Sequence, residues 1–261
     1  MRQFDKNKMV GLGAWSGIAL LFIASSCSTS YYVPNVRNVP SFNGSKELQA
    51  TGFYQMTMPD FTTSYNGQLA YSVNSNIGIM ANYNHSRNKD NITPLIGNYG
   101  EIGIGYFKRL DNVYYDCFVG GGIGKGAGII DNGLPNLFSP LGPPETPIEP
   151  EYRINATYNR LFLQPSLAYT LGKRLTASFV LRVDLLHFNN TVINKTTNEE
   201  TILSRIPVYY WGPASTLFIS VSKNLKFTQQ LGLNLSKDSQ SNDLNKFYIS
   251  MGLRYSFNLK K

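Results

Sequence analysis

The sequence predicts an all-β protein: a single antiparallel up-and-down transmembrane β-barrel of about ten strands, with about eight as the alternative count. Segments that alternate apolar and polar residues recur along residues 47–257. Short and long connections alternate between these segments, and aromatic residues gather at the expected strand ends. The mean hydropathy of −0.20 is too low for a bundle of transmembrane helices, each of which needs about 20 apolar residues.

The clearest strand lies at the end of the chain, in residues 246–257 (KFYISMGLRYSF). Its odd positions are apolar or aromatic and its even positions, apart from one tyrosine, are small, polar or charged, which is the period of a strand with two different faces. Its last part, SMGLRYSF, resembles the terminal strand signal of Gram-negative outer-membrane β-barrels, polar-x-Gly-x-x-aromatic-x-aromatic. The resemblance implies that Gly252, Tyr255 and Phe257 form an assembly signal read by the barrel-assembly machinery of the outer membrane.

The N-terminus has the layout of a signal peptide over residues 1–26. Basic residues precede an apolar run at 9–24, and small residues lead to Cys27. Ala24-Ser25-Ser26-Cys27 resembles a lipobox, which implies a lipoprotein-type signal peptide and a diacylglyceryl group on the Cys27 thiol. Ordinary cleavage near Cys27 without a lipid is the alternative.

Residues 27–46 carry Pro34, Pro40 and Gly44 and show no periodicity. We expect them to form an extended periplasmic tether that joins a lipidated Cys27 to the barrel. The barrel itself is expected to occupy residues 47–261, a length that all-β barrels commonly fold as one domain.

Ten segments have the strand period, and Pro165 interrupts the sixth. Proline cannot donate a ladder hydrogen bond, so a bulge or a break is expected there. The segments are 48–56, 67–73, 77–83, 102–106, 115–123, 161–169, 177–185, 217–221, 225–235 and 247–257.

The connections are of two kinds. Short turns are expected at 74–76, 110–112, 172–174 and 222–224, and long loops at 58–66, 86–98, 126–151, 188–213 and 237–245. In barrels of the outer membrane the short turns face the periplasm and the long loops face the outside. An even strand count then puts both termini on the periplasmic side, where a lipid anchor on Cys27 would also lie.

The second rows of the strands are expected to face the lumen, and they carry ionisable residues. The polar network predicted there consists of Glu101, Asp116, Arg160, Arg182, Asp184 and Arg254. A barrel of about ten strands is narrow enough for side chains to fill. Ion pairs across strands are therefore the favoured interpretation, and a thin hydrated path beside luminal glycines is the alternative.

No catalytic residue, metal site or cofactor is predicted, and we do not expect an enzyme. His85 and His187 fall on the outward row at the long-loop rim, away from the luminal carboxylates. The string G-x-G-x-x-A at 122–127 lacks the following helix that a nucleotide site needs. The net charge of +8 is spread over turns and the N-terminal signal without a basic helix, which disfavours nucleic-acid binding.

Three classes of function remain. The first is a structural or surface-interaction protein of the outer membrane, whose loops at 126–151 and 188–213 contact an unknown extracellular partner. The second is a narrow channel. The third is an outer-membrane hydrolase. A soluble lipocalin-like carrier of apolar ligands is the alternative to a membrane barrel. The carrier would place the apolar rows inside the barrel and the polar rows outside.

Overall fold

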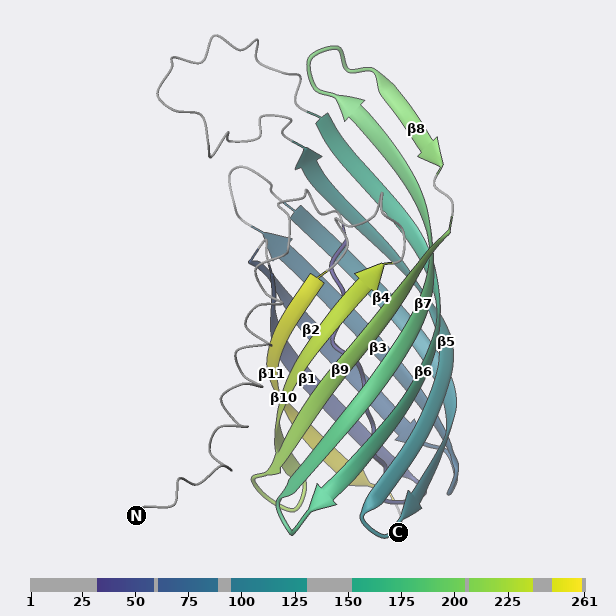
Figure 1. Cartoon of the computed structure of the whole chain (residues 1–261), viewed down its shortest axis with the longest axis vertical. Helices are drawn as coiled ribbons and strands as arrows, with labels where there is room; N and C mark the ends of the chain where they lie inside the picture. Colours follow the sequence, from purple (N-terminus) through teal and green to yellow (C-terminus); the bar gives the residue numbers. More distant parts are fainter. Residues whose placement is uncertain are drawn as a thin grey trace, which may run out of the picture.

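The structure is a computed structural model that describes residues 32–58, 61–88, 95–130, 152–204, 207–236 and 246–259. Within these ranges the chain forms eleven strands and no helix, and ten of the strands close into an antiparallel barrel (Figure 1). The predicted fold class and strand count are therefore confirmed. The strands are β1 (Glu47–Met58), β2 (Thr62–Ser72), β3 (Ile77–Asn88), β4 (Leu95–Leu110), β5 (Val113–Ile130), β6 (Tyr152–Leu171), β7 (Leu175–Asn194), β8 (Glu200–Ser204), β9 (Val208–Ser220), β10 (Leu225–Ser236) and β11 (Lys246–Asn258).

Each barrel strand pairs with its neighbours in the sequence, as an up-and-down barrel requires. The first and last strands, β1 and β11, close the ring in a register that runs from Glu47 opposite Asn258 to Met58 opposite Phe247. Strand β8 is the exception, because it pairs only with the upper part of β7. The two form a hairpin above the rest of the barrel (Figure 1).

The apolar rows face outward. On β7 the side chain of Phe179 is 53% exposed whereas that of its neighbour Val180 is fully buried, and the same alternation runs along most of the barrel strands. A continuous apolar outer surface of this size is unfavourable in water and favourable in a bilayer. The lipocalin-like alternative, with its apolar rows inside, is therefore wrong.

The predicted loop at 188–213 differs from the structure, which continues β7 to Asn194 and forms β8 from Glu200. Residues 191–193 are β-branched and suit a strand. The turn between the two strands is stabilised by the Asn194 side chain, whose Oδ1 accepts the Thr196 amide at 2.8 Å. Asn198 adopts a φ of 57°, which asparagine tolerates better than most residues.

Pro165 interrupts one ladder and leaves the register unchanged. Pairing between β6 and β7 stops after Leu163 opposite Val183 and resumes at Ser166 opposite Val180. The same register on both sides means that the proline causes a break and not a bulge.

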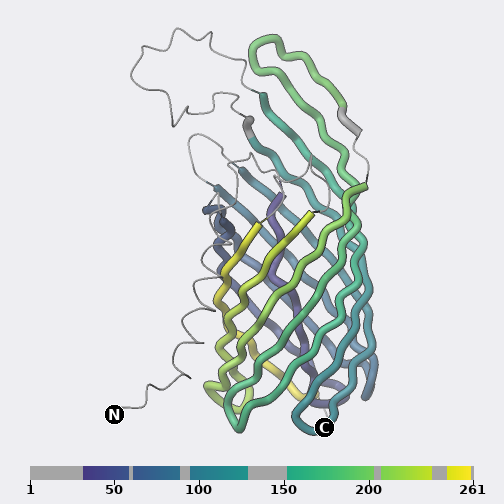
Figure 2. Tube along the Cα trace, in the orientation of Figure 1, coloured from purple at the N-terminus to yellow at the C-terminus, as the bar shows by residue number. Residues whose placement is uncertain are grey.

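Residues 32–42 lie inside the barrel, where Figure 2 shows the first described part of the chain running down the lumen. Every residue of this stretch is buried. The expectation of a tether outside the barrel is therefore wrong for these residues, which form no regular secondary structure. We call residues 32–42 the inner segment.

Candidate functional site: the filled lumen

The inner segment runs from one mouth of the barrel to the other. At its first residue, the Tyr32 ring lies 5.8 Å from that of Tyr210, measured between centroids. Tyr210 is the third residue of β9, at the mouth where the long connections are. At its last residue, the Phe42 ring lies 4.9 Å from that of Phe107, which is close to the short turn between β4 and β5.

Luminal side chains satisfy the backbone of the inner segment. An extended chain without a strand partner would otherwise bury unpaired amide and carbonyl groups, which folded proteins avoid. Gln230 acts as a fork, since its Oε1 accepts the Arg37 amide at 2.7 Å and its Nε2 donates to the Arg37 carbonyl at 3.0 Å. Further donors to the segment are Gln55 to the carbonyl of Pro34 at 2.7 Å, Gln68 to Val36 at 2.8 Å, Gln164 to Asn38 at 2.6 Å, and Arg254 to Val39 at 2.8 Å.

Apolar side chains of the inner segment form the centres of three clusters along the lumen. Tyr32 packs in the cluster at the long-loop end, Val36 and Val39 in the middle cluster, and Phe42 in the cluster at the short-turn end. The barrel residues of these clusters include Tyr99, Tyr158, Phe188, Tyr210, Phe53, Phe218, Tyr248, Met80, Phe107, Phe118 and Phe162. The segment is therefore an integral part of the hydrophobic core.

A buried ion network joins three strands around the inner segment. Arg160 on β6 donates two hydrogen bonds to the Asp184 carboxylate on β7, from Nε at 2.6 Å and from Nη2 at 2.5 Å. Arg182, also on β7, donates from Nε to Asp184 at 2.8 Å. It binds Glu101 on β4 with both of its terminal nitrogens, Nη1 at 2.9 Å and Nη2 in a very short contact. All four side chains are fully buried.

The inner segment contributes two residues to this network. Asn35 bridges it, donating to Glu101 at 3.0 Å and accepting from Nη1 of Arg160 at 2.9 Å. Arg37 lies 3.9 Å from the Asp184 carboxylate and donates from Nη2 to Asn234 at 3.1 Å. Three guanidinium groups thus surround two carboxylates, and Coulomb attraction in this low-dielectric interior ties the segment to the barrel wall.

The six residues of the predicted polar network all lie in the lumen, but only four meet. Glu101, Arg160, Arg182 and Asp184 form the ion network described above. Asp116 instead accepts the Ser166 hydroxyl at 2.5 Å, and Arg254 donates to Thr51 at 3.1 Å and to the inner segment. Sequence reasoning missed Asn35 and Arg37, because their stretch has no strand period.

Aromatic rings occupy the space beside the luminal glycines. A Cβ atom at Gly120 would lie 2.5 Å from the Phe162 ring, and one at Gly124 would lie 2.3 Å from the Tyr158 ring. At Gly78 it would lie 2.7 Å from the ring of Phe42 on the inner segment. These glycines accommodate bulky neighbours and do not border the hydrated path that we considered.

The residues of the predicted assembly signal lie on β11, beside the seam with β1. The rings of Tyr255 and Phe257 are both partly exposed on the outer surface, and their centroids are 4.5 Å apart. A Cβ atom at Gly252 would lie 2.7 Å from the Phe53 ring, so the glycine makes room for it. Recognition by the assembly machinery stays a prediction. Cys27 lies outside the described residues.

The two histidines lie on the outward rows, apart from the buried ion network. His85 contacts Asn98, with Nδ1 and Oδ1 2.9 Å apart, and His187 is exposed on the outer surface. No group of three His, Cys, Asp or Glu side chains in the described ranges could hold a metal ion. No helix there is long and apolar enough to cross a membrane.

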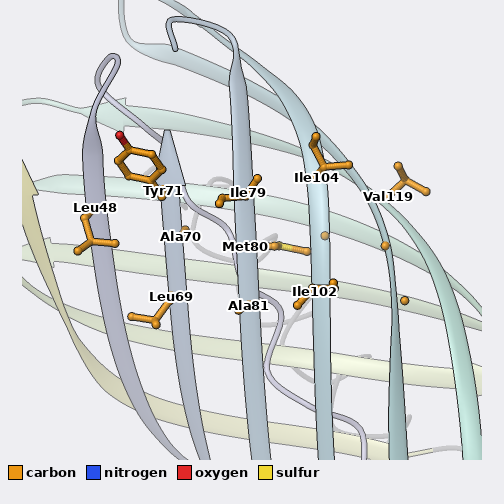
Figure 3. Close-up of a pocket in the computed structure, with 13 residues that line it drawn as sticks. Leu48, Leu69, Ala70, Tyr71, Ile79, Met80, Ala81, Ile102, Ile104 and Val119 are labelled. Atoms are coloured by element: carbon orange, nitrogen blue, oxygen red, sulfur yellow. The ribbon is translucent and has the colours of Figure 1, made fainter. Parts of the chain in front are cut away.

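An apolar hollow of the outer wall lies over β1 to β5 (Figure 3), with a volume of about 670 Å³. Ile79, Ile102, Ile104 and Val119 border it. Its lining is almost entirely apolar, because aliphatic side chains form most of it and Gly121 on β5 adds no side chain. Such a surface suits acyl chains of the bilayer and offers no group for chemistry.

Comparison with solved structures identifies the class of the fold. The chain is similar to the outer membrane protease OmpT from Escherichia coli, with 10% identity over 84% of this chain and 99% of that one, and a TM-score of 0.56. It is also similar to the translocator domain of the autotransporter NalP from Neisseria meningitidis, with 11% identity over 96% and 98% of the two chains and a TM-score of 0.50. No protein-family model and no curated protein sequence matches it.

The fold is therefore that of the outer-membrane β-barrels, and the apolar outer face agrees with this class. Identities this low define the fold and leave the particular role of the protein to be argued from its own residues.

Proposed function

We propose that the protein is a closed outer-membrane β-barrel that displays segments at the cell surface and does not conduct solutes. The observation that carries this proposal is the occupation of the lumen by the chain's own inner segment. Its eleven residues, from Tyr32 to Phe42, are buried along the whole lumen. A porin-like path would need water where these side chains and their partners lie.

The interactions of the inner segment support a permanent closure. Gln230 holds the Arg37 backbone at both its amide and its carbonyl, and Asn35 and Arg37 belong to the buried ion network. Leaving such groups unpaired in the interior costs about 1–3 kcal/mol for each. A filled lumen of this kind makes a rigid scaffold.

The part of the scaffold that is offered to a partner is the hairpin of β7 and β8, which rises above the barrel (Figure 1). Ile202 on β8 is 80% exposed and would be available for an apolar contact with this partner. We propose an extracellular protein or surface polymer as the partner. The hydrolase alternative has no support in the described side chains, where neither histidine contacts a carboxylate.

Conductance across a planar bilayer tests the closed barrel. The whole protein is expected to give no steady conductance. A variant with residues 32–42 replaced by a Gly/Ser sequence of equal length is expected to form open channels, provided that it still shows heat-modifiable migration. Steady channels of the same size in both proteins would contradict the proposal.

We also propose that Cys27 carries the lipid anchor, on the basis of its place after the signal peptide. Cys27→Ala should abolish metabolic labelling with a palmitate analogue while heat-modifiable migration of the barrel persists. Cys117→Ala is the matched control, since the structure places this free cysteine on the outer wall of β5. Labelling that survives Cys27→Ala would disprove the anchor and leave the closed barrel standing.

A further inference from the structure

We propose that the inner segment is an additional crossing of the membrane, so that the chain before Tyr32 leaves the barrel on the outer surface of the cell. The inference rests on the proposed location in the outer membrane. It reverses the expected periplasmic position of the N-terminus, and it carries the lipid of Cys27 to the outer leaflet.

The direction of the segment follows from its two ends. Tyr32 packs against Tyr210, the third residue of β9 from its long-loop end, with ring centroids 5.8 Å apart. It also packs against Tyr158, in the long-loop half of β6, with centroids 5.5 Å apart. Beyond Phe42 the chain turns at the opposite mouth. There the Ser72 hydroxyl donates to the Gly44 carbonyl at 2.6 Å, next to the short turn between β2 and β3.

The length of the segment matches a complete crossing. Eleven residues separate the two mouths, counted from Tyr32 to Phe42. At about 3.3 Å per residue an extended chain of this length spans roughly 36 Å, which exceeds the apolar band of about 25 Å in outer-membrane barrels.

The height of Tyr32 can be read from its neighbours on β9. Tyr209 and Trp211 flank Tyr210 and face outward, 59% and 53% exposed. Outward aromatic residues near strand ends mark the boundary between bilayer and water. Tyr32, inside the barrel beside Tyr210, is therefore level with the outer boundary of the membrane.

The distance from Tyr32 to the outer rim of the barrel is short. β9 begins at Val208, two residues before Tyr210, so the rim of the barrel on this side is low. Cys27 precedes Tyr32 by five residues, which reach up to about 18 Å when extended. The rim and the outer leaflet are both within this reach.

The hydrogen bonds of the segment oppose its withdrawal to the other side. Returning the N-terminus to the short-turn mouth would empty the lumen and leave Gln55, Gln68, Gln164 and Gln230 without their backbone partners. It would also remove Asn35 from between Glu101 and Arg160. The crossing is therefore fixed by the same contacts that fill the barrel.

The test uses an epitope followed by a protease site, inserted between Ser30 and Tyr31 of the whole chain. The matched control carries the same insert in the short turn at Lys173. In intact cells we expect antibody to bind the N-terminal epitope and added protease to remove it. The epitope at Lys173 should be detected only after the outer membrane is permeabilised.

A smaller probe serves where an insert prevents assembly. Ser30→Cys and Lys173→Cys, each in a Cys117→Ala background, are treated with a membrane-impermeant maleimide. Labelling of Ser30→Cys in intact cells, without labelling of Lys173→Cys, supports the crossing. Labelling of Ser30→Cys only after permeabilisation would overturn it. The closed lumen is judged separately by conductance, so the two proposals can fail independently.

Discussion

The guanidinium group of Arg37 occupies the place of a side chain at position 212: a Cβ atom on Gly212 would lie 2.0 Å from Nη2 of Arg37. Glycine inside a strand has no side chain to pack and weakens the strand unless another group approaches closely. Here the group that approaches is the inner segment. Strand β9 is thus shaped to receive a residue that precedes the barrel in the sequence.

Gly212→Ala should destabilise the protein by about 1–3 kcal/mol, because the added methyl group overpacks a closed site. The double variant Gly212→Ala/Arg37→Ala should show a favourable coupling, since the second change removes the clash. Urea unfolding in detergent micelles measures both. Gly67→Ala on β2 is the control, because a Cβ atom there meets nothing within 4 Å. Additive effects of the two substitutions would contradict the contact.

Asp184→Ala should reduce the free energy of unfolding by about 3–5 kcal/mol, because Arg160 would lose its carboxylate partner and three buried guanidinium groups would be left with the single carboxylate of Glu101. The exposed variant His187→Ala, on the same strand, should change it little. The temperature at which the folded band disappears from gels gives an independent measure. Equal stability of the two variants would indicate that water reaches and screens the network.

Gln230→Leu should expose the inner segment to exchange, because the Arg37 amide and carbonyl lose their partner. The cost of a buried unpaired group is about 1–3 kcal/mol. Amide hydrogen exchange at Arg37 should accelerate strongly. Gln229→Leu is the matched control, since this neighbour lies on the opposite, outward face of β10, between the buried Thr228 and Gln230. Slow exchange at Arg37 in Gln230→Leu would show that the two hydrogen bonds between Gln230 and the Arg37 backbone are dispensable.

The paired substitution Tyr255→Ser and Phe257→Ser should lower the yield of folded barrel in the outer membrane if these rings are the assembly signal. The expected readout is the fraction of protein that shows heat-modifiable migration in isolated membranes. Leu259→Ser is the control, since this exposed residue follows β11. Refolding of the purified double variant into detergent distinguishes a loss of recognition from a loss of stability.

The barrel was predictable because its signal is local and repeated. Alternation along a strand such as β7 reports the different surroundings of its two faces, so Arg182 and Asp184 could be assigned to the lumen from their positions alone. The pairing of Arg182 with Glu101 required the barrel to close, and no spacing in the sequence encodes it.

The inner segment was not predictable from periodicity, because it is surrounded by the barrel on every side. Val36, Arg37, Asn38 and Val39 are consecutive and all buried, which no strand with one wet face would show. A usable signal does exist in the strands. Their inner rows carry many amide side chains, which can donate to and accept from a backbone that has no partner strand. The inward amides are Gln55, Asn66, Gln68, Asn82, Gln164 and Gln230.

The seam between β1 and β11 imposes an order on biogenesis. It joins the two ends of the sheet over the whole length of β1. Once it has sealed, a chain with the lipid that we propose on Cys27 would have no passage through an interior already packed with rings and guanidinium groups. The sheet would therefore close around an inner segment that is already in place. The side of the membrane on which the N-terminus lies would then be fixed when β1 pairs with β11.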